Sequence, residues 1–182
     1  FSVNLARLNV SFPESEIITR FYKNGQLLPV YNILPSYRSA DNLFYNHNRS
    51  LIFDAGNEFR RFECLSVHYP TMGIDAIKYL SPYYHVELLP DAPRNNYIFD
   101  EDHDGCFVVR TVDSSDDPDI TADYVFVNFT LQSEKYLGEL FVVGQFNGWN
   151  KTSSNQMHYD EIRKCYTASI LMKQGYYEYA YQ

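Results

Sequence analysis

The sequence lacks the features that mark several large classes of protein. No apolar run approaches the roughly 20 residues that a membrane-spanning helix needs. The three cysteines, Cys64, Cys106 and Cys165, are far apart and form no CxxC pair, which excludes a zinc ribbon and a disulfide-rich scaffold. They leave either one disulfide with a spare thiol or three thiols buried in strands, and the usual burial of free cysteine favours the second arrangement.

Basic residues are also scarce. The chain has 15 Lys and Arg residues against 23 Asp and Glu residues, which gives a net charge of −8 at pH 7. Nucleic acids and anionic membranes attract basic surfaces, so this balance argues against both as partners. No signal peptide is visible and the chain starts at Phe1, which indicates a mature or trimmed piece of a longer protein.

Motifs typical of enzymes are missing as well. The five histidines are scattered, and none adjoins a nucleophile elbow of the form GxSxG. No Gly-rich loop is present to cradle phosphate, and no pattern places two carboxylates across a cleft for glycoside hydrolysis. We therefore expect a protein that is not an enzyme and uses no cofactor.

What the chain does have is aromatic and apolar residues in strand patterns. Aromatic residues make up 17% and hydrophobic residues 45% of the sequence, which is enough for a packed core. Alternation with period two recurs from end to end, whereas no long window shows helical periodicity. The predicted strands are Val3–Val10, Ile17–Tyr22, Leu27–Tyr31, Phe59–Tyr69, Tyr83–Leu89, Cys106–Val112, Tyr124–Leu131, Leu140–Gly144, Met157–Tyr159, Cys165–Leu171 and Gly175–Tyr181. The predicted fold class is therefore all-β.

Turn signals divide the chain. The dipeptide Asn24–Gly25 favours a tight hairpin. The segment Ile33–Phe44 is expected to be a loop rather than a short helix, because it holds Pro35 and several Asn and Ser residues. The stretch Asp113–Ile120 is acidic, contains proline and has few apolar residues, which is typical of a linker. We place a domain boundary there, near residue 119, after an antiparallel β domain of residues 1–119.

The second domain, residues 120–182, is predicted to be an Ig-like β-sandwich of the early-set or carbohydrate-module type. Such sandwiches have about seven strands, whereas residues 121–182 supply about five. Two alternatives follow. Either further strands lie beyond this chain, so that the domain is truncated at its C-terminus, or the two domains share one core.

The segment DEDHDG matches the opening DxDxDG of a calcium loop, with Asp100, Asp102 and Asp104 as candidate metal ligands. The twelfth position is Thr111, where the loop needs a bidentate Glu, and the residues after Gly105 resemble a strand. The competing interpretation is an acidic hairpin turn, which collects Asp and Gly for their backbone preferences.

Trp149 is the only tryptophan and lies in an aromatic turn after a predicted strand. An indole there can stack on a sugar face, and Asn147, Asn150 and Lys151 can supply hydrogen bonds. The letters FNGWN around Trp149 and GYYEYAY near the end of the chain resemble the glycogen-binding module of AMP-activated kinase and of starch-branching enzymes. That resemblance implies a glycan-binding function, whereas packing of Trp149 against the sandwich implies a structural role.

A dense polar run lies beside one predicted strand. It comprises Asn57, Glu58, Arg60 and Arg61, to which we add Arg94. A turn at residues 56–57 places Glu58 and Arg60 on one face of the strand and Arg61 on the other. An Arg–Glu pair between neighbouring strands, which fixes sheet geometry, is favoured over partner binding.

The tyrosines predict exposed aromatic surface. Seventeen are more than a core of this size absorbs, because each hydroxyl needs a hydrogen-bond partner or water. We expect some of the following to be exposed: Tyr22, Tyr31, Tyr37, Tyr45, Tyr83 and Tyr84.

Four segments, taken in order, resemble a known family. They are IFDAGNEFRRFE (52–63), PYYHVELLPDAPRNNY (82–97), ADYVFVNFTL (122–131) and LMKQGYYEYAY (171–181). Together they are similar to the plug proteins of the type IX secretion system of Bacteroidota, a family formerly known as a domain of unknown function. The resemblance implies a central to C-terminal portion of a periplasmic, cell-envelope protein, whose further N-terminal β domain and signal peptide lie outside this sequence.

The same resemblance implies a function. Plug proteins close the periplasmic mouth of the outer-membrane translocon barrel when no cargo-carrying shuttle occupies it, and they carry out no catalysis. The expected partner is therefore the protein of that barrel, reached by protein–protein contact without a membrane span. Aromatic-rich β domains suit such contact, because they offer a large area at low entropic cost.

Overall fold

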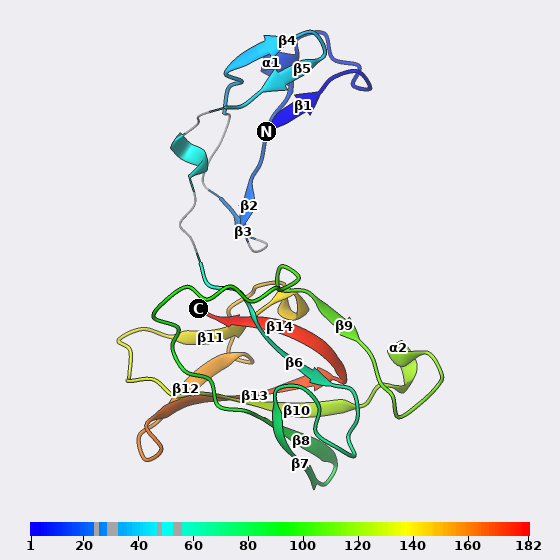
Figure 1. The fold of residues 1–182 in the computed structure, drawn as a ribbon, viewed down its shortest axis with the longest axis vertical. Helices are drawn as coiled ribbons and strands as arrows, with labels where there is room; N and C mark the ends of the chain where they lie inside the picture. Colours follow the sequence, from blue (N-terminus) through cyan, green and yellow to red (C-terminus); the bar gives the residue numbers. More distant parts are fainter. Residues whose placement is uncertain (24–25, 29–32, 47–48, 53–55) are drawn as a thin grey trace. The chain divides into compact units, whose positions relative to one another are not determined.

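The computed structural model describes residues 1–23, 26–28, 33–46, 49–52 and 56–182. The chain forms two compact units, Phe1–Ala55 and Gly56–Gln182 (Figure 1). It thus divides near residue 55, whereas the sequence predicted a boundary near residue 119.

The first unit is built from short strands. β1 (Ser2–Asn4), β5 (Asn42–Phe44) and β4 (Tyr37–Ser39) form an antiparallel sheet, and β2 (Tyr22–Lys23) and β3 (Gln26–Leu27) form a hairpin. The helix α1 (Pro13–Glu16) lies between β1 and β2 in the chain, and the 3₁₀ turn η1 (Arg49–Leu51) follows β5. The predicted hairpin is present, although Asn24 and Gly25 lie outside the described residues. The segment Ile33–Phe44 holds β4 and β5 rather than a continuous loop. Leu5, Leu43 and Tyr45 are buried together in the core of this unit.

The second unit is one sheet folded into two layers. In sheet order its strands are β6 (Arg60–Cys64), β14 (Gly175–Tyr181), β11 (Leu140–Val143), β12 (Gln156–Asp160), β13 (Cys165–Lys173), β10 (Tyr124–Leu131), β8 (Tyr83–Leu88) and β7 (Ile74–Leu80), with β9 (Phe107–Val109) also paired to β14. Strands β6, β9, β11 and β14 form one layer, and the other strands form the second layer (Figure 1). A short pairing of β11 with β12 connects the layers. The protein is all-β and its second unit is a β-sandwich, as the sequence predicted.

The core lies between the two layers. Alternation along β10 buries Val127 and Phe129, and Tyr177 and Tyr179 of β14 face them from the opposite layer. The ring of Phe62 contacts Phe129 and both tyrosines, with centroids 5.4 to 6.0 Å apart. Each large side chain buried in this way stabilises the fold by about 1.5–3 kcal/mol.

Strands from both sides of residue 119 share this core. β8 pairs in parallel with β10, and β6 pairs antiparallel with β14. Residues 121–182 supply five strands, β10 to β14, as predicted, and β6 to β9 complete the sandwich. Of the two alternatives left open by the sequence, the shared core is present in the structure.

The predicted linker is attached to the sandwich by hydrogen bonds. Asp113 accepts hydrogen bonds from the hydroxyl of Ser66 (2.6 Å), the N–H of Val67 (2.9 Å) and the side-chain amide of Gln174 (2.9 Å). A single helical turn, α2 (Pro118–Thr121), follows. The stretch is acidic and contains proline because it forms an anchored turn and a helix start.

Most predicted strands of the second unit are present with shifted ends. The predictions for β10 and β14 have the observed bounds, and those for β8 and β11 agree within one residue. The predicted strand Phe59–Tyr69 ends at Cys64. β7 was not predicted, because Asp75 and Lys78 interrupt its apolar pattern and the register shifts between Ile74 and Ala76.

Cysteines and tyrosines follow the sequence-based expectations in part. All three cysteines are free thiols, with Cys64 and Cys165 buried and Cys106 half-buried. Of the six tyrosines expected at the surface, Tyr22, Tyr37 and Tyr83 are exposed, Tyr84 is half-buried, Tyr45 is buried and Tyr31 lies outside the described residues. In the part of the chain that the structure describes, the helices are too short and polar to span a membrane.

Candidate functional site

Strand β14 has two different faces. Tyr177, Tyr179 and Tyr181 point into the sandwich, so by the alternation of a strand Glu178 and Ala180 point to the opposite face. The carboxylate of Asp91 contacts the tyrosines of the inner face. Glu178 itself lies on the outer face of the strand. The polar chemistry of the second unit gathers around these two carboxylates.

Asp91 is held by two tyrosines and an arginine. Its Oδ2 accepts hydrogen bonds from the hydroxyls of Tyr179 (2.8 Å) and Tyr181 (2.6 Å). Its Oδ1 lies 3.0 Å from Nε of Arg60, close enough for an ion pair but poorly aligned for a hydrogen bond. Because the backbone of Asp91 pairs with Leu131, the carboxylate joins the layer of β10 to that of β14. Burial, with the charge of Asp91 added, raises the pKa of both tyrosines.

Glu178 is fully buried and is held mainly by backbone N–H groups. The N–H of His103 donates to both carboxylate oxygens (2.8 and 2.9 Å), and the N–H of Gly105 donates to Oε2 (2.8 Å). The hydroxyl of Tyr176 donates to Oε1, and Nδ1 of His103 lies 3.1 Å from the same oxygen. Arg61 is opposite Glu178 in the register of β6 and β14, but no ion pair joins the two. The turn at residues 103–105 therefore closes over this carboxylate.

Cys106 completes the surroundings of Glu178. Its carbonyl accepts a hydrogen bond from the N–H of Glu178 (2.9 Å). Its thiol, a ring nitrogen of His103 and a carboxylate oxygen of Glu178 lie within 4.8 Å of one another. Burial, and next the charge of Glu178, raise the pKa of the thiol. Among the described residues, this is the one group of three or more His, Cys, Asp or Glu side chains close enough to share a metal ion.

The acidic turn does not bring its three aspartates together. Asp100 lies 2.8 Å from the guanidinium of Arg61, and Asp102 accepts hydrogen bonds from two backbone N–H groups, one of them that of Asp104. Asp104 and Gly105 have φ of 58° and 77°, the left-handed pair that an Asp-Gly hairpin turn requires. The competing interpretation of this segment, a turn that uses Asp and Gly for backbone reasons, describes the structure.

Trp149 is buried rather than open to a sugar. Its side chain packs with Phe141 and Val143 and is 8% exposed, and its ring centroid is 5.3 Å from that of Phe59. A Cβ atom on Gly105 would lie only 2.4 Å from the indole, so glycine is required there. Gly105 of the DxDxDG segment and Trp149 therefore pack directly against each other.

The other residues predicted to contact a glycan are held by the same turn. The side chain of Asn147 accepts from the N–H of Gly144 (3.1 Å) and donates to the carbonyl of Val142 (2.9 Å). The side chain of Asn150 donates to the carbonyl of Asn147 (2.9 Å), and Lys151 is exposed. Because the indole of Trp149 is buried, these residues do not surround an exposed aromatic ring on which a sugar could stack.

The predicted polar cluster attaches β6 to the segment after β8. Asn57 donates to the carbonyl of Arg94 (3.3 Å), and Arg94 donates to the carbonyl of Glu58 (2.7 Å). Arg60 and Arg61 lie on opposite faces of β6, as predicted, and each pairs with an aspartate. Two Arg–Asp pairs thus take the place of the predicted Arg–Glu pair.

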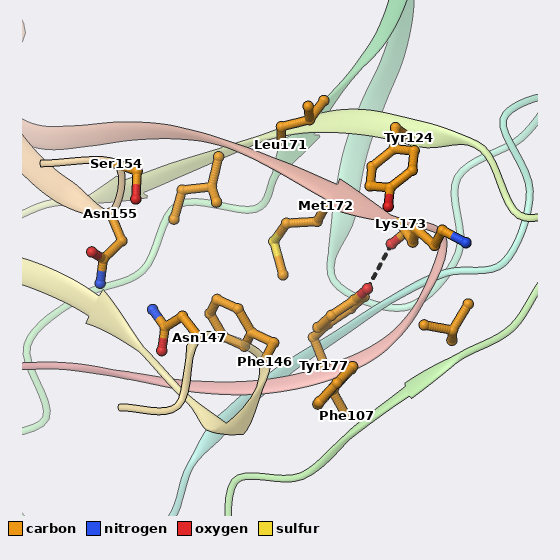
Figure 2. Close-up of a pocket in the computed structure, with 12 residues that line it drawn as sticks. Phe107, Tyr124, Phe146, Asn147, Ser154, Asn155, Leu171, Met172, Lys173 and Tyr177 are labelled. Atoms are coloured by element: carbon orange, nitrogen blue, oxygen red, sulfur yellow. Dashed lines mark hydrogen bonds between the residues drawn. The ribbon is translucent and has the colours of Figure 1, made fainter. Parts of the chain in front are cut away.

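A groove of about 430 Å³ opens between the layers on one side of the sandwich (Figure 2). Phe146, Met172 and Tyr177 point into it, and Phe107 and Leu171 lie at its exposed rim. The hydroxyl of Tyr177 donates to the carbonyl of residue 173 (2.8 Å), which links the two layers across the groove. Its lining is mainly apolar.

Two strand edges flank this groove. Strand β12 pairs with only three residues of β13, Cys165 to Thr167, and β9 pairs along one edge with β14. The remaining edge of β13 and the outer edge of β9 have no strand partner in the described part of the chain. Unpaired edges beside an apolar groove are able to accept an extended segment of another protein.

Comparisons with known proteins include a likeness to a solved structure. No protein-family model matches the chain, and no curated protein does. The chain is similar to the crystal structure of a hypothetical protein from Parabacteroides merdae, with 33% sequence identity over 99% of this chain and a TM-score of 0.82. It covers 46% of that protein, so it spans about half of its length. This likeness establishes a shared fold and carries no activity with it.

Sequence reasoning missed Asp91, His103 and Glu178 as the centres of the polar contacts. Glu178 stands at an outward position of an aromatic strand, where a solvated glutamate is the ordinary expectation. The segment that covers it comes from about 75 residues earlier in the chain, and no local pattern reveals such a contact. The available signal was the single acidic residue within GYYEYAY.

Proposed function

We propose that this chain is part of a type IX secretion plug protein, acting without catalysis in the periplasm by contact with the outer-membrane translocon barrel. The observation that carries the proposal is the resemblance of four segments in order. In the structure the strands of these segments are neighbours, because β6 pairs with β14, and β8 and β13 pair with β10. From Gly56 onwards, the resembling residues therefore belong to one folded unit.

The open side of the sandwich supports a role in protein contact. Phe107, Tyr124 and Leu171 are exposed around the groove, and two unpaired strand edges lie next to them. Exposed apolar residues beside a groove are typical of surfaces that bind other proteins. We assign contact with the translocon to this side.

Binding of the purified chain to the isolated barrel in detergent tests the proposal. We expect saturable binding that is lost when the cargo-carrying shuttle occupies the barrel. The double variant F107S/L171E should weaken binding at least tenfold, since it removes two apolar contacts and adds a charge. Leu137→Glu is the matched control, because Leu137 is exposed and does not line the groove. A barrel that binds wild type and the double variant equally would rule out this surface, and a barrel that binds neither would rule out the function.

Tryptophan fluorescence tests the competing glycan-binding function. Trp149 is the only fluorescent indole, and its burial predicts emission at short wavelength that does not change during titration with maltoheptaose or a glycan panel. A saturable shift of this emission would instead favour a carbohydrate module.

A further inference from the structure

The residues around Glu178 suggest a binding site that belongs neither to the proposed secretion function nor to the candidate calcium loop. His103, Cys106 and Glu178 offer one nitrogen, one sulfur and one oxygen donor, all within 4.8 Å of one another. From these positions we propose that His103 Nδ1, Cys106 Sγ and Glu178 Oε1 bind a zinc ion.

The spacing of the donors fits one small ion. In a tetrahedral zinc site, bonds of about 2.0–2.3 Å place the ligand atoms roughly 3.3–3.8 Å apart. Nδ1 of His103 already lies 3.1 Å from Oε1 of Glu178. The sulfur of Cys106, on a half-buried side chain, lies within 4.8 Å of the other two donors.

The donor types select zinc over calcium. Calcium and magnesium prefer six or more oxygen ligands, whereas zinc takes mixtures of imidazole, thiolate and carboxylate. Asp100 and Asp102 of the turn face other partners, and His103 points to the carboxylate of Glu178. The segment that resembles a calcium loop thus contributes His103 as a zinc ligand, in place of its aspartates.

The protein holds the ligands in place before any metal binds. The N–H groups of His103 and Gly105 both donate to Glu178, and the N–H of Glu178 donates to the carbonyl of Cys106. These hydrogen bonds fix the backbone of all three ligands relative to one another. Preorganisation of this kind lowers the entropic cost of metal binding.

Charge and access favour a cation here. Glu178 is fully buried and forms no ion pair with Arg61, its cross-strand neighbour. Four acidic residues of the turn, at positions 100, 101, 102 and 104, raise the local concentration of cations. The side chain of His103 is 67% exposed, so an ion can enter from solvent, and water can take the fourth position.

Cobalt and zinc titrations of the whole reduced chain test the site. Co²⁺ bound by a thiolate in tetrahedral geometry gives a near-ultraviolet charge-transfer band and intense visible bands. We expect these bands with wild type, and their removal by added Zn²⁺. Of the other cysteines, Cys64 and Cys165 are buried and in no such group, so the band reports on Cys106.

Variants assign the ligands. Cys106→Ser and His103→Asn should each weaken Zn²⁺ affinity about 100-fold or more, measured by competition with a chromophoric chelator. His158→Asn is the matched control, since His158 is exposed and outside the group, and it should leave the affinity unchanged. A wild-type Co²⁺ spectrum without the thiolate band overturns the proposal, as does Zn²⁺ affinity that Cys106→Ser leaves unchanged. The spectrum is recorded on wild type, so the test stands even where a variant folds poorly. Neither result depends on binding to the translocon.

Discussion

Asp91 and Glu178 both contact strand β14, yet they are stabilised by different kinds of donor. Asp91 is held by side chains, the hydroxyls of Tyr179 and Tyr181 and the guanidinium of Arg60, and its side chain is 22% exposed. Glu178 has no exposure and is held chiefly by backbone N–H groups. Side-chain donors can change rotamer when their acceptor is altered, whereas backbone donors in a closed turn cannot. The comparison predicts that substituting Asp91 and substituting Glu178 lower the free energy of unfolding by different amounts.

The isosteric substitution Glu178→Gln gives the largest expected effect. It turns an amide N–H₂ toward backbone N–H groups that need an acceptor, so we expect a loss of about 3–4 kcal/mol in the free energy of unfolding. Urea unfolding measures this loss. Glu134→Gln, on an exposed side chain, should change stability by less than about 0.5 kcal/mol. A loss below about 1 kcal/mol for Glu178→Gln would show that the turn opens and hydrates its own N–H groups.

Asp91→Asn should cost less, about 2 kcal/mol, because its donors are side chains that can shift and the amide oxygen of Asn can still accept from them. Combining it with Tyr181→Phe in a double-mutant cycle should give a coupling of about 1 kcal/mol. The measurement is again urea unfolding. Equal losses for Asp91→Asn and Glu178→Gln would remove the distinction between side-chain and backbone donors.

Gly105→Ala disturbs the turn without touching the carboxylate. The positive φ of Gly105 and the short distance from a Cβ to Trp149 predict a loss of about 2 kcal/mol. Trp149 emission should move to longer wavelength as the indole is displaced. The control is Gly138→Ala, where a Cβ meets no atom within 4 Å. Unchanged emission in Gly105→Ala would contradict the packing contact.

A third carboxylate, Asp113, extends the comparison, and its substitution is expected to have the smallest effect on stability. Burial raises its pKa, but hydrogen bonds from Ser66, Val67 and Gln174 outweigh burial, and the net pKa is lowered. A lowered folded-state pKa gives stability that is present above the unfolded pKa, about 3.9, and is lost as the pH falls further. Asp113→Asn should therefore be less stable than wild type at pH 7, and the difference should shrink below about pH 4. A stability difference that does not change with pH would show that the substitution acts through packing and not through the charge of Asp113.

How much the sequence predicted depends on how local each feature is. The alternation in Tyr124–Leu131 fixed β10 with its observed bounds, because one face of that strand is uniformly apolar. The Asp-Gly signal at residues 104–105 correctly indicated a turn. The packing of Trp149 on Gly105 could not be predicted, since two segments 44 residues apart each looked like a separate site.

The domain boundary was misplaced for a related reason. Residues 113–120 have the composition of a linker, and composition says nothing about the hydrogen bonds that attach Asp113 to Ser66 and Gln174. The parallel pairing of β8 with β10 crosses this segment, and a pairing of that kind leaves no local signature. Sequence reasoning therefore identified the strands and the fold class but divided them in the wrong place.

The position of β14 within its layer has a consequence for how the protein folds. This strand pairs with β6, β9 and β11, which are made up to 115 residues before it. No smaller set of strands completes that layer, so the sandwich is expected to fold cooperatively, only after β14 has been made, and slowly for its size. Until β14 is available, the apolar faces of β6 and β10 remain open to other chains, a condition in which chaperones protect nascent proteins from aggregation.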